Sequence, residues 1–184
     1  MTSTIESITL EINMNYGNIK FYDIANGEGI RTSLFVSGCT NHCQGCFNEE
    51  SQDFNYGRLY TPETEQTILE QISKPYVAGL SILGGDPLCQ DSEGKLQLLH
   101  LIQKVTKLHK TTWLWTGFIW EEAIKDPLNR SLFGWCDVVV DGPFIEAQKD
   151  LTLAFRGSSN QRIIDAQETL KQNKIIIYNG EFHD

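Results

Sequence analysis

The chain has 184 residues, of which 40% are apolar, and this size suits a single globular domain with a substantial core. Asp and Glu outnumber Lys and Arg by 24 to 15, which gives a formal net charge of -9. This balance argues against a nucleic-acid partner, because phosphate binding requires clustered basic side chains. No stretch approaches the roughly 20 apolar residues that span a bilayer, and residues 1–11 lack the basic and apolar regions of a secretory signal. We therefore expect a cytoplasmic protein that binds neither nucleic acid nor membrane.

Predicted strands and helices alternate along the chain. Largely apolar runs predict strands at residues 30–37, 77–83, 111–116 and 136–140. A helix over residues 62–73 is expected to begin with Thr61 as its N-cap and Pro62 in its first turn. Apolar residues recur every three or four positions after Asp91, which predicts a second helix of roughly 15 residues. Residues 120–125 are expected to form a shorter helical segment.

This alternation favours an α/β fold with a mostly parallel sheet, because each crossover helix covers one face of the sheet. The units are too few to close an eight-stranded barrel, so we expect a partial, open β/α barrel. No linker, repeat or low-complexity tract divides the sequence, and a single domain is expected to span residues 1–184.

Four of the predicted strands end in chemically unusual residues. These ends are the cysteine cluster at residues 39–46, Gly84-Gly85-Asp86, Trp115-Thr116-Gly117 and Asp141-Gly142. In parallel sheets the functional loops lie at the carboxyl ends of the strands. We therefore expect these four segments to converge on one rim.

The cysteines carry the strongest chemical signal. Three of the five, Cys39, Cys43 and Cys46, form a C-x3-C-x2-C pattern, which is too compact for the dispersed disulfides of a secreted scaffold. Thiolates at this spacing can bind three corners of a 4Fe-4S cluster and leave one iron open for another ligand.

Two alternative sites use the same cysteines. His42 could join them as the fourth ligand of a structural zinc ion, although closed zinc sites usually pair ligands from two separated knuckles. Cys89 or Cys136 could instead complete a four-thiolate cluster for electron transfer. We favour packing roles for both: Cys136 begins an apolar strand, and Cys89 follows the glycine loop.

The cysteine pattern, followed one strand later by Gly84-Gly85-Asp86, resembles the radical S-adenosylmethionine (SAM) superfamily. The resemblance implies that the open iron chelates SAM and that the Gly-Gly-acid loop binds its amino group. Asp86 replaces the commoner Glu but keeps a carboxylate for a charge-assisted hydrogen bond. Gly45 stands where the superfamily often has an aromatic residue, so Phe47 is the aromatic side chain expected near the nucleoside.

A narrower resemblance is to the anaerobic ribonucleoside-triphosphate reductase activating proteins, and it covers about residues 15–165. It is carried by Gly38-Cys39 through Cys46-Phe47-Asn48, by Gly84 to Leu88, by Trp115-Thr116-Gly117, by Asp141-Gly142-Pro143-Phe144 and by Phe155 to Arg162. The N-terminal dozen residues and the tail beyond Asp165 remain unassigned.

The resemblance implies a radical SAM oxidoreductase that activates a glycyl-radical enzyme. A flavodoxin-like or ferredoxin-like donor would reduce the cluster, and SAM would be cleaved to methionine and a 5'-deoxyadenosyl radical. That radical would form a glycyl radical on the partner, an anaerobic ribonucleoside-triphosphate reductase. This chemistry requires no general acid or base. The alternatives are an activator of a formate-lyase type enzyme and a small-molecule enzyme such as a deazaguanine synthase; residues 141–144 and 156–160 favour the reductase activator.

Further candidate residues lie around this predicted centre. Thr116, Gly117 and Asp141 end predicted strands on this rim, and each either lines the SAM site or has a structural role. Residues 156–162 either contact the partner or the SAM carboxylate, or form a turn before a final strand. A row of lysines on the second helix could dock an acidic electron donor or form that helix's solvated face; it comprises Lys104, Lys107 and Lys110.

Overall fold

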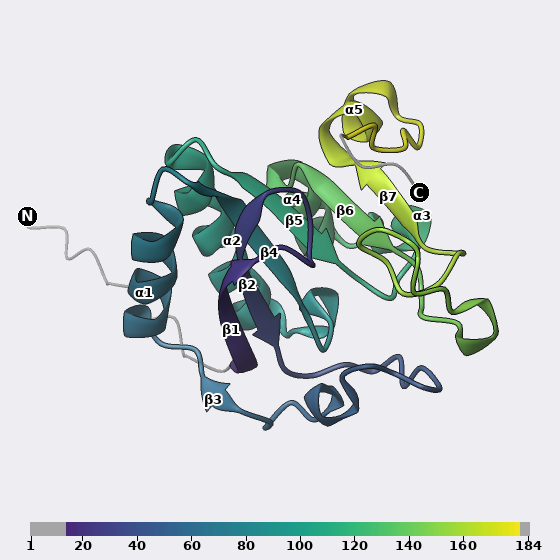
Figure 1. The fold of residues 1–184 in the computed structure, drawn as a ribbon, viewed down its shortest axis with the longest axis horizontal. Helices are drawn as coiled ribbons and strands as arrows, with labels where there is room; N and C mark the ends of the chain where they lie inside the picture. Colours follow the sequence, from purple (N-terminus) through teal and green to yellow (C-terminus); the bar gives the residue numbers. More distant parts are fainter. Residues whose placement is uncertain (1–13, 181–184) are drawn as a thin grey trace, which may run out of the picture.

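The computed structural model describes residues 14–180, and they form a seven-stranded open sheet with the order β3-β1-β2-β4-β5-β6-β7 (Figure 1). The strands are β1 (Asn15–Asp23), β2 (Ile30–Val36), β3 (Arg58–Leu59), β4 (Val77–Gly84), β5 (Thr111–Trp115), β6 (Val138–Asp141) and β7 (Arg162–Asp165). The predictions that concern residues 1–13 lie outside the described residues, as does the end of the tail at 181–184.

The middle of the sheet is parallel. β2, β4, β5 and β6 are neighbours and run in the same direction, while β1, β3 and β7 pair antiparallel with their neighbours at the two sides. The predicted α/β class and mostly parallel sheet are therefore confirmed, and the carboxyl ends of the four parallel strands share one rim.

The helices lie between or after the strands along the chain and pack against one face of the sheet. They are α1 (Pro62–Ile72), α2 (Ser92–Lys107), α3 (Trp120–Ala123), α4 (Pro127–Trp135) and α5 (Ala166–Gln172). Thr61 caps α1 as predicted, since its Oγ1 accepts a hydrogen bond from the N–H of Thr64, and Asp91 caps α2 through the N–H of Gly94. None of the helices within residues 14–180 is both long and apolar enough to cross a bilayer.

The main core lies between the sheet and these helices. Ile68 and Ile72 of α1, and Leu98 and Leu101 of α2, are fully buried there against the strands. The opposite face carries a smaller cluster around Trp113, which packs against loop residues rather than a helix. This second face of the sheet is therefore covered less completely than the first.

One buried arginine links neighbouring strands at the end of the sheet opposite the cysteines. Arg31 is 1% exposed, and its guanidinium donates to Oγ of Ser81 at 2.8 Å and to the carbonyls of Leu80 and Thr111 at 2.8 and 3.0 Å. Burial lowers the pKa of Arg31 to about 10. These bonds join β2, β4 and β5, so the parallel strands are held in register far from the rim.

The lysine row extends beyond its predicted helix, because α2 ends at Lys107 and Lys110 lies between α2 and β5. Lys104 pairs with Glu65, and Nζ of Lys110 donates to the carbonyls of Lys74 and Val77 at the beginning of β4. This end of α2 lies beside the amino ends of the parallel strands, away from the cysteine rim. Lys104 and Lys107 are exposed, as the solvated-face interpretation requires, and docking of an electron donor on the row stays a prediction.

Candidate functional site

The three predicted cluster cysteines lie on one long loop that leaves β2 and runs to β3, which we call the cysteine loop (residues 37–57). Figure 1 shows this loop passing below the sheet, beneath the ends of the parallel strands. Cys39, Cys43 and Cys46 are all half-buried. The backbone folds the loop back on itself, because the N–H of Gly38 donates to the carbonyl of Ser51 at 2.7 Å.

Backbone amides already point at two of the sulfur atoms. The N–H of Asn41 donates to Sγ of Cys39, and the N–H of Asn48 donates to Sγ of Cys46, both at 3.4 Å. Such bonds stabilise thiolates and tune the potential of an iron–sulfur cluster. The donor set of three thiols with amides directed at them therefore fits a 4Fe-4S cluster.

The spacing of the sulfurs bears on the zinc alternative. Thiolates that share one zinc ion lie about 4 Å apart, because each zinc–sulfur bond is about 2.3 Å long. Among residues 14–180 the one group of three ligand atoms within 4.8 Å of each other is Cys39, Asp86 and Cys89, not the predicted trio. His42 is turned toward Gln52, with Nδ1 2.8 Å from its Oε1. The predicted trio therefore does not have the spacing of ligands that share one zinc ion.

The Gly-Gly-Asp segment at the end of β4 is bonded directly to the cysteine loop. The N–H of Gly85 donates to the carbonyl of Val36 at 2.7 Å, and the N–H of Asp86 donates to the carbonyl of Gly38 at 2.9 Å. A Cβ atom at Gly85 would lie 2.5 Å from the carbonyl oxygen of Gly38. The absence of a side chain at position 85 therefore lets the two loops touch.

The carboxylate of Asp86 joins three loops of the rim. It is 1% exposed and accepts hydrogen bonds from Oγ1 of Thr116 at 3.0 Å and from the N–H groups of Gly117 at 2.8 Å and Leu88 at 2.9 Å. The side-chain amide of Asn41 donates a fourth, at 3.0 Å. Burial raises the pKa of Asp86 to about 7, while these donors favour its ionised form.

Four donors fill the acceptor capacity of a carboxylate. In this arrangement Asp86 and Thr116, two of the residues predicted to bind SAM, bind each other. Contact between Asp86 and the ammonium group of SAM therefore requires one of the four donors to leave.

Asp141, which was also predicted to line the SAM site, already binds other groups of the protein. It is 1% exposed and forms a two-pronged ion pair with Arg162, whose Nε and Nη2 lie 3.0 and 2.5 Å from its two oxygens. Its Oδ2 also accepts the N–H of Trp120 at 2.7 Å, at the beginning of α3. Glu121 binds the other side of the Arg162 guanidinium, so Asp141 links β6, β7 and α3.

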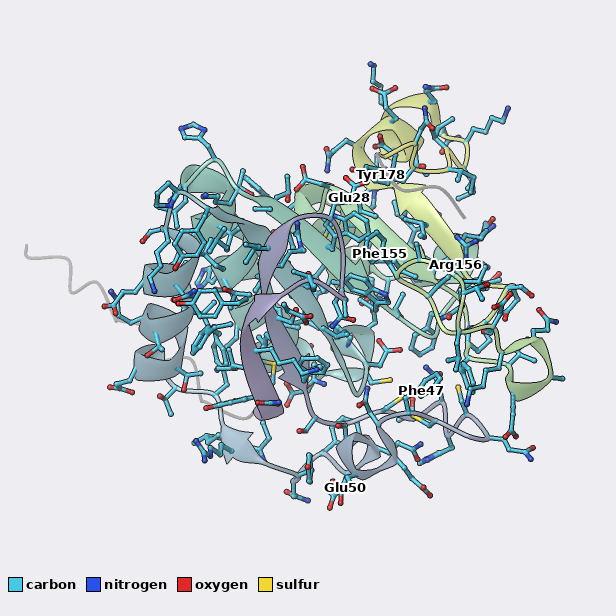
Figure 2. All side chains as sticks on the ribbon, in the orientation of Figure 1. Glu28, Phe47, Glu50, Phe155, Arg156 and Tyr178 are labelled. Atoms are coloured by element: carbon cyan, nitrogen blue, oxygen red, sulfur yellow. The ribbon has the colours of Figure 1, made fainter. Side chains whose placement is uncertain are left out.

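A second loop lies against the cysteine loop. It connects β6 to β7 (residues 142–161), and we call it the rim loop. The ring of Phe47 is 57% exposed and lies 5.0 Å from the ring of Phe144, with Nζ of Lys149 4.9 Å from its centre. Gly45 has φ +70° and lies beside Glu146. Figure 2 shows Phe47 between the two loops, at the end of the molecule opposite Glu28 and Tyr178.

The segment at 156–162 forms the predicted turn before a final strand, and its contact with the partner or with SAM stays a prediction. Oε1 of Gln161 accepts the N–H groups of Gly157 and Ser158 at 2.8 and 3.2 Å, and Nε2 of Gln161 donates to the carbonyl of Gly142. Arg162 then begins β7. This side-chain bonding explains the polar composition of the segment.

A hollow of about 500 Å³ adjoins Cys46 on the open face of the sheet. Its walls include Asn18 and Lys20 of β1, Phe35 of β2, and Phe47, Glu50 and Tyr56 of the cysteine loop. The residues of β1 were not predicted to belong to the site, because the bulges in this strand obscure which side chains share a face. Asn41 was also missed, although it stands between two of the cysteines.

The remaining cysteines differ in environment. Cys136 is fully buried in the main core, as predicted. Cys89 was expected to pack in the core or at the rim, and it lies half-buried at the rim, with its Sγ within 4.8 Å of Sγ of Cys39. The hydrogen bond between them lowers the pKa of Cys89 to about 6 and raises that of Cys39.

Comparisons with known proteins agree with this arrangement. A family model described as a 4Fe-4S single cluster domain matches residues 25–164. Relatives named anaerobic ribonucleoside-triphosphate reductase-activating protein are similar over most of their length. The relative from Haemophilus influenzae is 40% identical over 156 residues, which cover 82% of this chain and 97% of the relative.

Two further relatives carry the same name. That from Escherichia coli K12 is 36% identical over 152 residues, covering 80% of this chain and 96% of the relative. That from Enterobacteria phage T4 is 35% identical over 150 residues, covering 82% of this chain and 93% of the relative. The chain therefore belongs to the family of anaerobic ribonucleoside-triphosphate reductase-activating proteins and contains its 4Fe-4S domain.

Proposed function

We propose that this chain activates an anaerobic ribonucleoside-triphosphate reductase by reductive cleavage of SAM at a 4Fe-4S cluster held by Cys39, Cys43 and Cys46. The observation that carries the proposal is the trio of half-buried thiols on one loop at the rim, in a member of this family. Cys39, Cys43 and Cys46 would hold the cluster, which would supply the electron for cleavage of SAM to a 5'-deoxyadenosyl radical that would take a hydrogen atom from a glycine of the reductase.

The protein's own residues hold and orient the cysteine loop. Asn41 and Asn48 direct N–H groups at two of the thiolates, and Asn41 also attaches the loop to Asp86 through its side chain. Asp86 and Thr116 thereby act as positioning residues for the rim, and Asp141 does the same through Arg162. Gly84 lets the end of β4 lie close to β2, Gly85 lets it lie close to the cysteine loop, and Gly45 leaves room for the side chain of Glu146.

SAM would occupy the rim beside Cys46, where the hollow provides both apolar and polar walls. Phe35 and Phe47 offer aromatic surfaces for the adenine, and Lys20 offers a cation for the carboxylate. The open sheet, which we propose to be a partial barrel of the radical SAM type, would leave this rim accessible to a polypeptide, as a glycine-bearing loop requires. A flavodoxin-like or ferredoxin-like donor in the cytoplasm would supply the electron.

The test is electron paramagnetic resonance on an anaerobic mixture of the reconstituted, reduced protein, SAM and an anaerobic ribonucleotide reductase. We expect a glycyl radical signal with the wild-type chain and with Cys136→Ala, whose thiol lies in the core. We expect none with Cys43→Ala. A signal with a formate-lyase type enzyme but not with the reductase would overturn the choice of partner, and cleavage of SAM by Cys43→Ala would overturn the assignment of the ligands.

A further inference from the structure

Cys89 is a half-buried thiol with no part in the proposed chemistry, yet it faces one of the proposed cluster ligands. Its Sγ lies within 4.8 Å of Sγ of Cys39 and of a carboxylate oxygen of Asp86. Thr40 contacts the same sulfur, with its N–H at 3.4 Å and its Oγ1 at 3.2 Å. The sulfur of Cys89 is therefore held toward the cysteine loop rather than toward the core.

Hydrogen bonds between the two segments keep Cys39 and Cys89 close together. The segment that carries Cys89 is bonded to the beginning of the cysteine loop at two points. Nε2 of Gln90 donates to the carbonyl of Ser37 at 2.9 Å, and the N–H of Asp86 donates to the carbonyl of Gly38 at 2.9 Å. Because β2 and β4 are paired neighbours in the sheet, this contact is part of the fold.

Two thiols and a carboxylate at this spacing could bind a single metal ion, but Asp86 is not available for it. Its carboxylate already accepts four hydrogen bonds, so a metal would gain two protein ligands at most. Two neighbouring thiols have another reaction open to them. A disulfide needs the sulfurs to approach to about 2.05 Å, and the sulfurs of Cys39 and Cys89 already lie within 4.8 Å of each other.

We propose that Cys39 and Cys89 are a redox modification site: in the cluster-free chain, hydrogen peroxide converts them to a reversible disulfide. The thiolate of one cysteine attacks the peroxide and becomes a sulfenic acid, and the second thiol then displaces the oxygen as water while the S–S bond forms. Two electrons pass from the two sulfurs to the peroxide, which leaves as two water molecules. A dithiol returns two electrons and two protons and restores both thiols.

One consequence rests on the proposed function. If Cys39 is a cluster ligand, the disulfide removes it, so the oxidised chain cannot rebuild the cluster until a dithiol reduces it. The protein would thus be kept in a protected, cluster-free form after oxidative loss of its iron. Protection here means that Cys39 does not proceed to the irreversible sulfinic and sulfonic acids.

The disulfide is tested by peptide mapping of the cluster-free protein after treatment with hydrogen peroxide and blocking of free thiols. Trypsin releases Cys39 on the peptide 32–58 and Cys89 on the peptide 59–95, because Lys74 precedes a proline. We expect these peptides to be joined within one chain, with fragmentation assigning the bond to Cys39, and to separate on adding dithiothreitol. Cys89→Ser should abolish the link, and Cys136→Ala, which removes a distant thiol, should keep it.

Absence of the joined peptides in the wild-type chain, or their joining mainly through Cys43 or Cys46, would overturn the proposal. Reconstitution of the oxidised chain with iron and sulfide separates this result from the proposed function. We expect no brown colour until dithiothreitol is added. A chain that carries the disulfide and still rebuilds its cluster would overturn the assignment of Cys39 as a ligand while leaving the modification site intact.

Discussion

The side-chain amide of Asn41 donates a hydrogen bond of 3.0 Å to Oδ2 of Asp86, and this bond attaches the cysteine loop to the end of β4. Asn41 lies between two of the proposed cluster ligands, and its own N–H donates to Sγ of Cys39. Gly117 makes room for the amide, because a Cβ atom there would lie 2.3 Å from Nδ2 of Asn41. One residue thus orients a proposed ligand and bonds to a buried carboxylate.

Replacing Asn41 should lower both the free energy of unfolding and the retention of the cluster. Asn41→Ala leaves the buried carboxylate of Asp86 with one donor fewer, which costs about 1–3 kcal/mol of the free energy of unfolding. Urea unfolding of the cluster-free protein measures this loss, and iron content after gel filtration measures cluster retention. Asn55→Ala, on an exposed part of the same loop, is the control. Equal stability and equal iron in the two variants would contradict the role of Asn41.

A side chain at position 85 should push the two loops apart. In Gly85→Ala the new Cβ meets the backbone oxygens of Gly38 at 2.5 Å and of Ser51 at 2.7 Å, and neither can move without shifting the cysteine loop. We expect a loss of about 2 kcal/mol in the free energy of unfolding and a smaller yield of reconstituted cluster.

The matched control for this change is Gly134→Ala. Gly134 lies in the last turn of α4, and a Cβ there would have no atom within 4 Å. Alanine is the better helix former, so this variant should gain up to about 0.5–1 kcal/mol. If both alanine variants unfolded at the same urea concentration, the tight approach of the loops at Gly85 would be refuted.

Removing Arg162 should leave the buried carboxylate of Asp141 without its partner cation. Arg162→Met leaves Asp141, which is 1% exposed, without its cation, and a loss of about 3–5 kcal/mol is expected for breaking such a pair from one side. Lys125→Met breaks the exposed pair with Glu122 and should cost less than about 1 kcal/mol. Thermal unfolding of the two variants compares them directly, and a small loss in Arg162→Met would show that Asp141 does not depend on the arginine.

The bond between Glu121 and Arg162 should make stability depend on pH. The hydrogen bonds from Arg162 lower the pKa of Glu121 below its ordinary 4.5. A carboxyl whose pKa is lower in the folded state stabilises the fold above its unfolded pKa, and this contribution is lost as the pH falls through the folded value. Glu121→Gln should therefore be less stable than the wild type at pH 7, and the difference should shrink below pH 4.5. A difference that stays constant across this range would mean that the ionised carboxylate is not responsible.

The parallel core of this fold could be predicted from local patterns, because each of its strands is an apolar run that ends in glycine, cysteine or aspartate. The helix α4 was missed, although Asp126 and Pro127 repeat the cap of α1, with Oδ1 of Asp126 accepting the N–H of Asn129 at 2.9 Å. β1 was missed because two register shifts break its alternation with β2. In both cases a signal was present but weaker than that of the parallel strands.

The convergence of the cysteine, Gly-Gly-Asp and Thr-Gly segments on one rim was also predicted, and Asp86 joins all three. The partners of the individual carboxylates could not be predicted. Whether Asp141 meets a ligand or Arg162 depends on the antiparallel register of β6 and β7, and whether Cys89 meets Cys39 depends on the pairing of β2 and β4. Contacts between residues this far apart along the chain arise only once the sheet has assembled.

Because β7 runs antiparallel to β6, the rim loop departs from and returns to the same edge of the sheet. Residues inserted at its exposed tip near Leu151, which is 79% exposed, would lengthen the connection without altering any strand pairing. Closing a longer loop costs little, about 0.6 kcal/mol for each doubling of its length. The rim loop next to Phe47 can therefore vary in length among proteins that share this sheet. The surface of the protein can change there while the sheet that carries the cysteine loop stays the same.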